Sequence, residues 1–132
     1  MKTERRRFGD AGEDLAAAFL ARRGFRVLAR NVRVPRVGEI DIVALDPTSP
    51  SGLRGASGGT LVFVEVKTRR NDAFGPPEEA VTPAKLRTLA ACAEAWRNAT
   101  GWRDRPYRID VVAVDLAAGR GDIRHLKGVA LD

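Results

Sequence analysis

The stretch LVFVEVKT, residues 61–68, decides the fold. Its nearly unbroken apolar run predicts a central β-strand covered on both faces, because a half-exposed strand alternates apolar and polar side chains. Two charged residues, Glu65 and Lys67, interrupt the valines. An ionised carboxylate in a buried strand is costly unless it is paired or binds a metal. The stretch therefore predicts the middle of a sheet and a candidate functional site on it.

The segments around this strand alternate between helical and extended patterns. Apolar periodicity, the Gly24 helix stop, and Thr82-Pro83 as a helix start set the boundaries. The predicted elements are a helix at 11–23, strands at 25–34, 37–45 and 61–68, a helix at 83–98, a strand at 107–116 and a short edge strand at 122–126. The order α-β-β-β-α-β plus an edge strand predicts an α/β domain, with a mixed sheet flanked by helices rather than a Rossmann sheet.

Length and composition favour a single domain over residues 1–132. Residues 1–8 read as a basic N-terminal tail, and residues 46–59, DPTSPSGLRGASGG, as a flexible loop. No apolar run reaches the length of a membrane span, and no signal-peptide core follows the basic N-terminus. We therefore expect a cytoplasmic protein with no membrane partner.

The residue types exclude several kinds of site. One cysteine, Cys92, rules out an internal disulfide and a Cys-rich zinc site, and one histidine, His125, leaves little room for histidine chemistry. No G-x-G-x-x-G or P-loop motif is present. A metal would therefore be held by oxygen ligands, which favours Mg²⁺, Mn²⁺ or Ca²⁺.

Positive charge is concentrated in the first half of the chain. Residues 1–70 carry 14 Lys and Arg against 8 Asp and Glu, whereas residues 71–132 carry 9 of each kind. Such a one-sided excess is typical of a face that binds a polyanion such as nucleic acid. The alternative is an arginine-rich proteome, because arginine greatly outnumbers lysine.

A second buried-strand acid lies in GEIDIVAL, where Asp41 stands between Ile40 and Ile42. Because side chains alternate along a strand, Asp41, Glu65 and Lys67 converge on one patch if the two strands are neighbours in register. Two close carboxylates repel unless a cation lies between them, and Mg²⁺ accepts such ligands. Lys67 would then activate a metal-bound water or stabilise charge on a phosphate. The alternative is a Glu–Lys ion pair without a metal.

Two further acids are candidates by position. Glu13 sits at the edge of the apolar face of the first helix, from which it could reach the sheet, or it could simply favour the helix dipole. Glu39 shares the strand face of Asp41, where it is an outer-shell group or a surface acid at the strand end.

The sequence blocks together resemble a known family. The stretches are GEDLAAAFLARRGFRVLARNVR, GEIDIVA, LVFVEVKTRR, FGPPEEAVTPAKLRTL and YRIDVVAV. They are similar to the bacterial YraN-type family of small uncharacterised proteins, over residues 9–126. That family is placed in the PD-(D/E)xK, restriction-endonuclease-like superfamily and resembles the archaeal Holliday junction resolvases.

The resemblance implies roles for individual residues. Asp41 matches the first acid of the superfamily motif, Glu65-Val66-Lys67 matches (D/E)xK, and Glu13 matches the helical glutamate of resolvases. The Val66 carbonyl would be an extra metal ligand. Ile40 stands where the superfamily name has proline, and Leu86 where many relatives carry glutamine. The cations expected to contact the nucleic-acid backbone are Lys85, Arg33, Arg36, Arg69 and Arg70.

The functional hypothesis is a Mg²⁺- or Mn²⁺-dependent endonuclease acting on DNA, with branched DNA as a candidate substrate. A non-catalytic nucleic-acid-binding or scaffold module with the same fold is the alternative, and a protein-interaction domain is a third. Nucleases with one site per domain often act as homodimers, although the sequence shows no interface.

Overall fold

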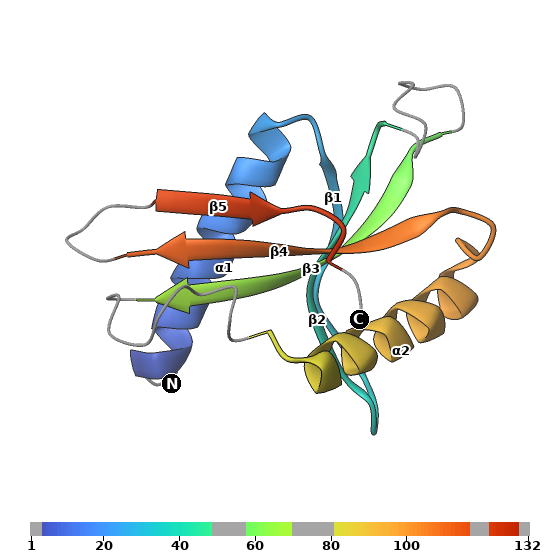
Figure 1. The fold of residues 1–132 in the computed structure, drawn as a ribbon, viewed down its shortest axis with the longest axis horizontal. Coiled ribbons are helices and arrows are strands. Elements are labelled where there is room, and N and C mark those ends of the chain that lie inside the picture. The colour runs from blue at the N-terminus through green and yellow to red at the C-terminus, as the bar shows by residue number, and fades with distance from the viewer. Residues whose placement is uncertain (1–3, 49–57, 70–80, 117–121, 130–132) are drawn as a thin grey trace.

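The computed structural model describes residues 4–48, 58–69, 81–116 and 122–129 (Figure 1). Its elements are α1 (Glu4–Arg22), β1 (Arg26–Val34), β2 (Gly38–Asp46), β3 (Thr60–Arg69), α2 (Pro83–Thr100), β4 (Tyr107–Asp115) and β5 (Asp122–Leu126). This order confirms the α/β prediction, including the short final strand. No helix in the described ranges is long and apolar enough to cross a membrane.

The five strands form one mixed sheet in the order β1-β2-β3-β4-β5. Neighbouring strands are antiparallel except β3 and β4, which run parallel. Parallel neighbours need a crossover connection, and α2 lies within this one. The stretch at 61–68 is therefore the middle strand of the sheet, as its apolar run predicts.

The helices cover opposite faces of the sheet and make three layers (Figure 1). Leu20 of α1 packs with Ile42, Val64 and Val112 on one face. On the other face α2 packs Cys92 and Ala93 against a group of strand residues that comprises Ile40, Val43, Leu61 and Phe63. Val64 and Phe63 therefore point to opposite helices, so the apolar run is explained by burial on both faces.

The ends of the helices show which boundaries local sequence was sufficient to predict. Thr82 caps α2 by accepting a hydrogen bond from the Lys85 N–H at 3.1 Å, and Gly101 ends it in the left-handed conformation. Gly24, with φ of 89°, follows α1 as predicted. However, α1 begins at Glu4, so residues 4–8 are helical and not a tail. Of the predicted loop at 46–59, Asp46 belongs to β2, and residues 49–57 lie outside the described part of the chain.

Gly12 allows α1 to lie close to β3. A Cβ added at Gly12 would overlap the side chain of Thr68, which is β-branched and cannot easily turn away. We expect Gly12→Ala to lower the free energy of unfolding by about 1–3 kcal/mol. Gly9→Ala is the matched control, because nothing lies within 4 Å of its added Cβ. Chemical denaturation should show that change to be neutral or stabilising by up to about 1 kcal/mol; similar losses in both variants would contradict the close packing.

Candidate active site

The candidate site lies where β2 and β3 separate. Residues 42–46 of β2 pair with residues 60–64 of β3, and the pairing stops there. Beyond it, β2 stays paired with β1 as far as Gly38, while β3 stays paired with β4 as far as Arg69. Figure 1 shows the two strands diverging from this point. We call this divergence the fork, and Asp41 and Glu65 lie one step beyond the last pair.

Asp41 bridges the fork with its side chain. Its Oδ2 accepts a hydrogen bond from the Val66 N–H at 2.8 Å, a donor left without a ladder partner by the departure of β2. Burial, and then repulsion by Glu65, raise the pKa of Asp41 to about 7. The structure thus brings Asp41 beside Glu65, as strand parity predicts. It also makes Asp41 reluctant to carry a negative charge without an added cation.

Two lysines approach the other carboxylate. Glu65 is only 5% exposed, and its Oε1 lies 2.8 Å from Lys85 Nζ and 3.7 Å from Lys67 Nζ. Burial and the adjacent Lys85 lower the pKa of Lys67. Burial opposes the charge of Lys85 as well, but Glu65 outweighs it and raises the pKa of Lys85. Lys85 is therefore the charged partner of Glu65, and Lys67 is the amine that loses its proton more easily.

Glu13 borders the site but is held by another residue. It is 6% exposed, and its Oε1 accepts a hydrogen bond from Arg30 Nε at 2.9 Å. Its charge still adds to the repulsion that raises the pKa of Asp41. Within the described ranges, no three His, Cys, Asp or Glu residues gather as a ready-made metal site. The carboxylate pair would need the Val66 carbonyl and water to complete a coordination shell.

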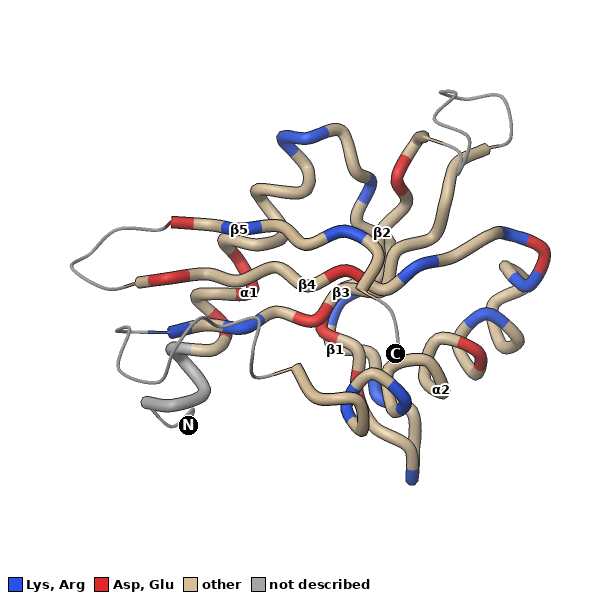
Figure 2. The backbone as a smooth tube through the Cα atoms, in the orientation of Figure 1, with Lys and Arg blue, Asp and Glu red and all other residues tan. Residues whose placement is uncertain are grey.

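The predicted basic residues do not form one continuous rim. Arg33 and Arg36 lie with Glu39 around a cavity of about 280 Å³ at the tip of the β1–β2 hairpin. Glu39 is the cross-strand neighbour of Arg33 and is exposed, which agrees with a surface acid at the strand end. Arg69 ends β3 on the fork side, where Figure 2 shows basic residues along the strand. Arg70 lies outside the described residues.

Sequence reasoning missed a further buried acid in the sheet. Asp110, fully buried in β4, accepts hydrogen bonds from Arg108 Nε and the Gly128 N–H, both at 2.9 Å, and its Oδ2 lies 2.8 Å from His125 Nε2. Burial by itself would raise the pKa of Asp110, but these partners hold it below its usual value. Its position between apolar residues in YRIDVVAV was the available signal.

Fold and site together define a class of protein: a three-layer α/β domain with paired carboxylates and lysines at a fork in a mixed sheet. The chain belongs to the uncharacterised protein family UPF0102, whose family model matches residues 12–114. This confirms the predicted resemblance to the YraN-type family.

Relatives from diverse bacteria match most of the chain. The UPF0102 protein of Symbiobacterium thermophilum is 50% identical over 83% of this chain and 83% of its own length. That of Pelobacter propionicus is 41% identical over 95% of this chain and 83% of its own. That of Renibacterium salmoninarum is 45% identical over 92% of this chain and 93% of its own. The family model therefore covers α2, α1 from Gly12 onward and the strands that meet at the fork.

Lys85 places a positive charge beside the Glu65 carboxylate, where a bound metal ion would place one. We expect Lys85→Gln to raise the affinity of the chain for Mn²⁺ several-fold, because one competing positive charge is removed from the carboxylates. Isothermal titration calorimetry without nucleic acid measures the change. Arg87→Gln is the matched control, since Arg87 is an exposed cation on the same helix. Unchanged affinity in Lys85→Gln, or an equal gain in the control, would contradict competition by Lys85.

Proposed function

We propose that this chain is a metal-dependent endonuclease that hydrolyses DNA phosphodiester bonds. One observation carries the proposal: Asp41 and Glu65 lie one step beyond the last β2–β3 pair, close enough that Glu65, together with burial, raises the pKa of Asp41 to about 7. A pair of like charges, with Glu65 buried and Asp41 half-buried, is unfavourable as a structural device but suits a divalent cation. The resemblance to PD-(D/E)xK nucleases supports the same reading, because Glu65-Val66-Lys67 and Asp41 match that motif.

The donor atoms fit Mg²⁺ or Mn²⁺. Asp41, Glu65 and the Val66 carbonyl would hold the ion, since these hard oxygen donors are the ligands such ions prefer. A bound divalent cation would lower the pKa of water and neutralise charge on the scissile phosphate. Glu13 would act from outside the coordination shell through its repulsion of Asp41, whereas Glu39, an exposed acid at the strand end, would take no part.

The two lysines would have different roles in the reaction. Lys67 has a lowered pKa, so its amine is suited to take a proton from the attacking water. Lys85 keeps its charge and lies in the first turn of α2, where a phosphate is favoured by the helix N-terminus. Arg33, Arg36, Arg69 and Arg70 would contact backbone phosphates without reading sequence. Cleavage of both strands would then need two copies of the chain, acting as a homodimer.

A cleavage assay tests the proposal. The protein is incubated with supercoiled plasmid, single-stranded DNA and a four-way junction, with Mg²⁺, Mn²⁺ or EDTA. We expect metal-dependent cleavage that is lost in Asp41→Asn and Glu65→Gln and retained in Asp104→Asn, which removes an exposed carboxylate far along the chain. The three substrates separate general nuclease activity from a preference for branched DNA. Absence of cleavage on all three, or cleavage that survives both site variants, would refute the enzymatic proposal.

A non-catalytic nucleic-acid-binding module is the second candidate. It is favoured by two ion pairs of the candidate site, because Glu13 already has Arg30 as its cationic partner and Glu65 has Lys85. Binding that weakens steeply with salt, combined with no cleavage, would support this alternative. The same DNA substrates in a mobility-shift titration provide that measurement.

A further inference from the structure

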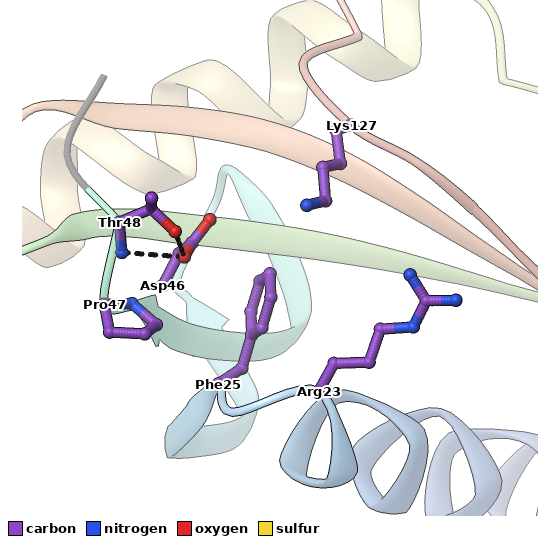
Figure 3. Close-up of a pocket in the computed structure, with 6 residues that line it drawn as sticks. All are labelled: Arg23, Phe25, Asp46, Pro47, Thr48 and Lys127. Atoms are coloured by element: carbon purple, nitrogen blue, oxygen red, sulfur yellow. Dashed lines mark hydrogen bonds between the residues drawn. The ribbon is translucent and has the colours of Figure 1, made fainter. Parts of the chain in front are cut away.

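A larger cavity, of about 390 Å³, lies at the end of β2 farthest from the fork. Its lining residues are Arg23, Phe25, Asp46, Pro47, Thr48 and Lys127 (Figure 3). Asp46 is five residues from Asp41 along β2, which corresponds to about 17 Å in an extended strand. The cavity is therefore separate from the paired carboxylates.

Two cations reach this cavity from different elements. Arg23 follows α1, Lys127 follows β5, and Figure 3 shows their side chains extending beside the ring of Phe25. The Arg23 guanidinium lies 4.6 Å from the centre of the Phe19 ring, and Lys127 Nζ lies 5.7 Å from that of Phe25. In the part of the chain that the structure describes, neither forms an ion pair with a carboxylate. Both charges are exposed and available to a ligand.

The one carboxylate in the lining already has hydrogen-bond and ion-pair partners. Asp46 Oδ1 accepts hydrogen bonds from the Thr48 N–H at 2.9 Å and the Thr48 hydroxyl at 2.5 Å. Its Oδ2 lies 2.8 Å from Arg108 Nη2. Burial would raise the pKa of Asp46, but Thr48 and Arg108 hold it below its usual value. Asp46 is thus turned towards its own partners, and Arg23 and Lys127 determine which charge the cavity attracts.

We propose that this cavity binds a phosphate ester, with Arg23 and Lys127 contacting the phosphate. Cavities that hold small organic ligands begin at roughly 300 Å³, so there is room beyond a bare phosphate for an organic group. Pro47 offers an apolar wall for that group, whereas Phe25, only 6% exposed, mainly supports Lys127. A free mononucleotide and a nucleotide within a strand both carry a phosphate ester with an attached organic group, so either could bind in this way. The proposal does not depend on nuclease activity at the fork.

Titrations followed by NMR test this site on the full chain, labelled with ¹⁵N and without divalent metal. The probes are inorganic phosphate, deoxyadenosine monophosphate and a short single-stranded oligonucleotide. We expect saturable shifts of the amide signals of Phe25, Thr48 and Lys127, with the mononucleotide binding more tightly than phosphate. Competition between the mononucleotide and the oligonucleotide shows whether a nucleotide within a strand can use the same site.

Paired variants make the test specific. Arg23→Gln with Lys127→Gln should weaken mononucleotide binding about tenfold or more, because two charge-assisted contacts are removed. Arg22→Gln with Arg103→Gln removes the same total charge from exposed positions and should leave binding unchanged. Equal weakening in both pairs would overturn the site, as would amide shifts at Glu65 and Val66 in place of Thr48. Phosphate binding as tightly as the mononucleotide would overturn the assignment to an ester.

Discussion

Replacing Asp110 by asparagine should lower the free energy of unfolding by about 3 kcal/mol at pH 7, because it removes one charge from a buried, hydrogen-bonded group. Asp110 is fully buried between Arg108 and His125 and also accepts the Gly128 N–H. Asparagine has almost the same shape but cannot balance Arg108. Because Arg108 retains its ion pair with Asp46, the loss should lie near the lower end of the range for broken buried pairs.

Urea denaturation at several pH values measures this loss. The pKa of Asp110 in the folded chain lies below its ordinary value of 3.8, so the stabilisation is fully present above about pH 4. It is lost as the pH falls through the folded pKa, and the two proteins should then converge. Asp104→Asn is the matched control, since it removes an exposed aspartate and should change the free energy of unfolding by less than about 0.5 kcal/mol. A loss in Asp110→Asn no larger than that of the control would contradict the network.

Asp110 also shows how far the sequence argument for a functional site extends. Acids between apolar strand residues mark Asp41, Glu65 and Asp110 alike, and the sequence gives no reason to separate them. The structure separates Asp41 from Asp110 by their partners. Asp110 has Arg108 and His125, drawn from its own strand and from neighbouring β5, whereas Asp41 has the like-charged Glu65. An acid between apolar strand residues therefore predicts that its side chain has an unusual electrostatic environment. The charge of the neighbouring side chains then distinguishes a structural ion pair from a candidate cation site.

The fold was predictable because its signals are local. Turn residues, helix caps and the doubly covered central strand are all encoded within a few residues, and the element order follows from them. The start of α1 was not predictable, because the arginines at residues 5–7 lack the apolar period that marks a buried helix face. The fork was not predictable either. It depends on β2 staying paired with β1 rather than with β3 beyond Ile42, and this is a pairing between distant segments that no local pattern encodes.

The position of Lys85 belongs to the same class of unpredictable features. Sequence placed it near the start of α2 as a phosphate contact, and the cap at Thr82 confirmed that local position. Its contact with Glu65 at 2.8 Å depends on how α2 packs over β2 and β3. Strand parity alone predicts the closeness of Glu65 and Lys67, but the nearer cation comes from a helix about twenty residues away in sequence.

Asp41→Asn is expected to stabilise the metal-free chain at pH 8, which is the opposite outcome to that of Asp110→Asn. Burial and Glu65 raise the pKa of Asp41 from 3.8 to about 7. A raised pKa means that the folded state favours the protonated acid, so stability is lost as the pH rises from about 4 to 7. Asparagine removes the charge and can still accept the Val66 N–H through its amide oxygen. The gain should be on the order of 2–4 kcal/mol above pH 7 and vanish below pH 4.

Thermal unfolding at pH 4 and pH 8, with and without Mn²⁺, separates relief of the repulsion between Asp41 and Glu65 from a general effect of charge. In the wild type, Mn²⁺ should raise the melting temperature at pH 8, by an amount equivalent to about 2.7 kcal/mol at a hundred times the dissociation constant. Asp41→Asn should begin from a higher melting temperature and gain much less, because one ligand of the proposed ion is missing. A gain from Mn²⁺ that is equal in the two proteins would place the cation away from Asp41. Stabilisation by Asp41→Asn that is the same at pH 4 and pH 8 would mean that its source is packing, not repulsion between the two carboxylates.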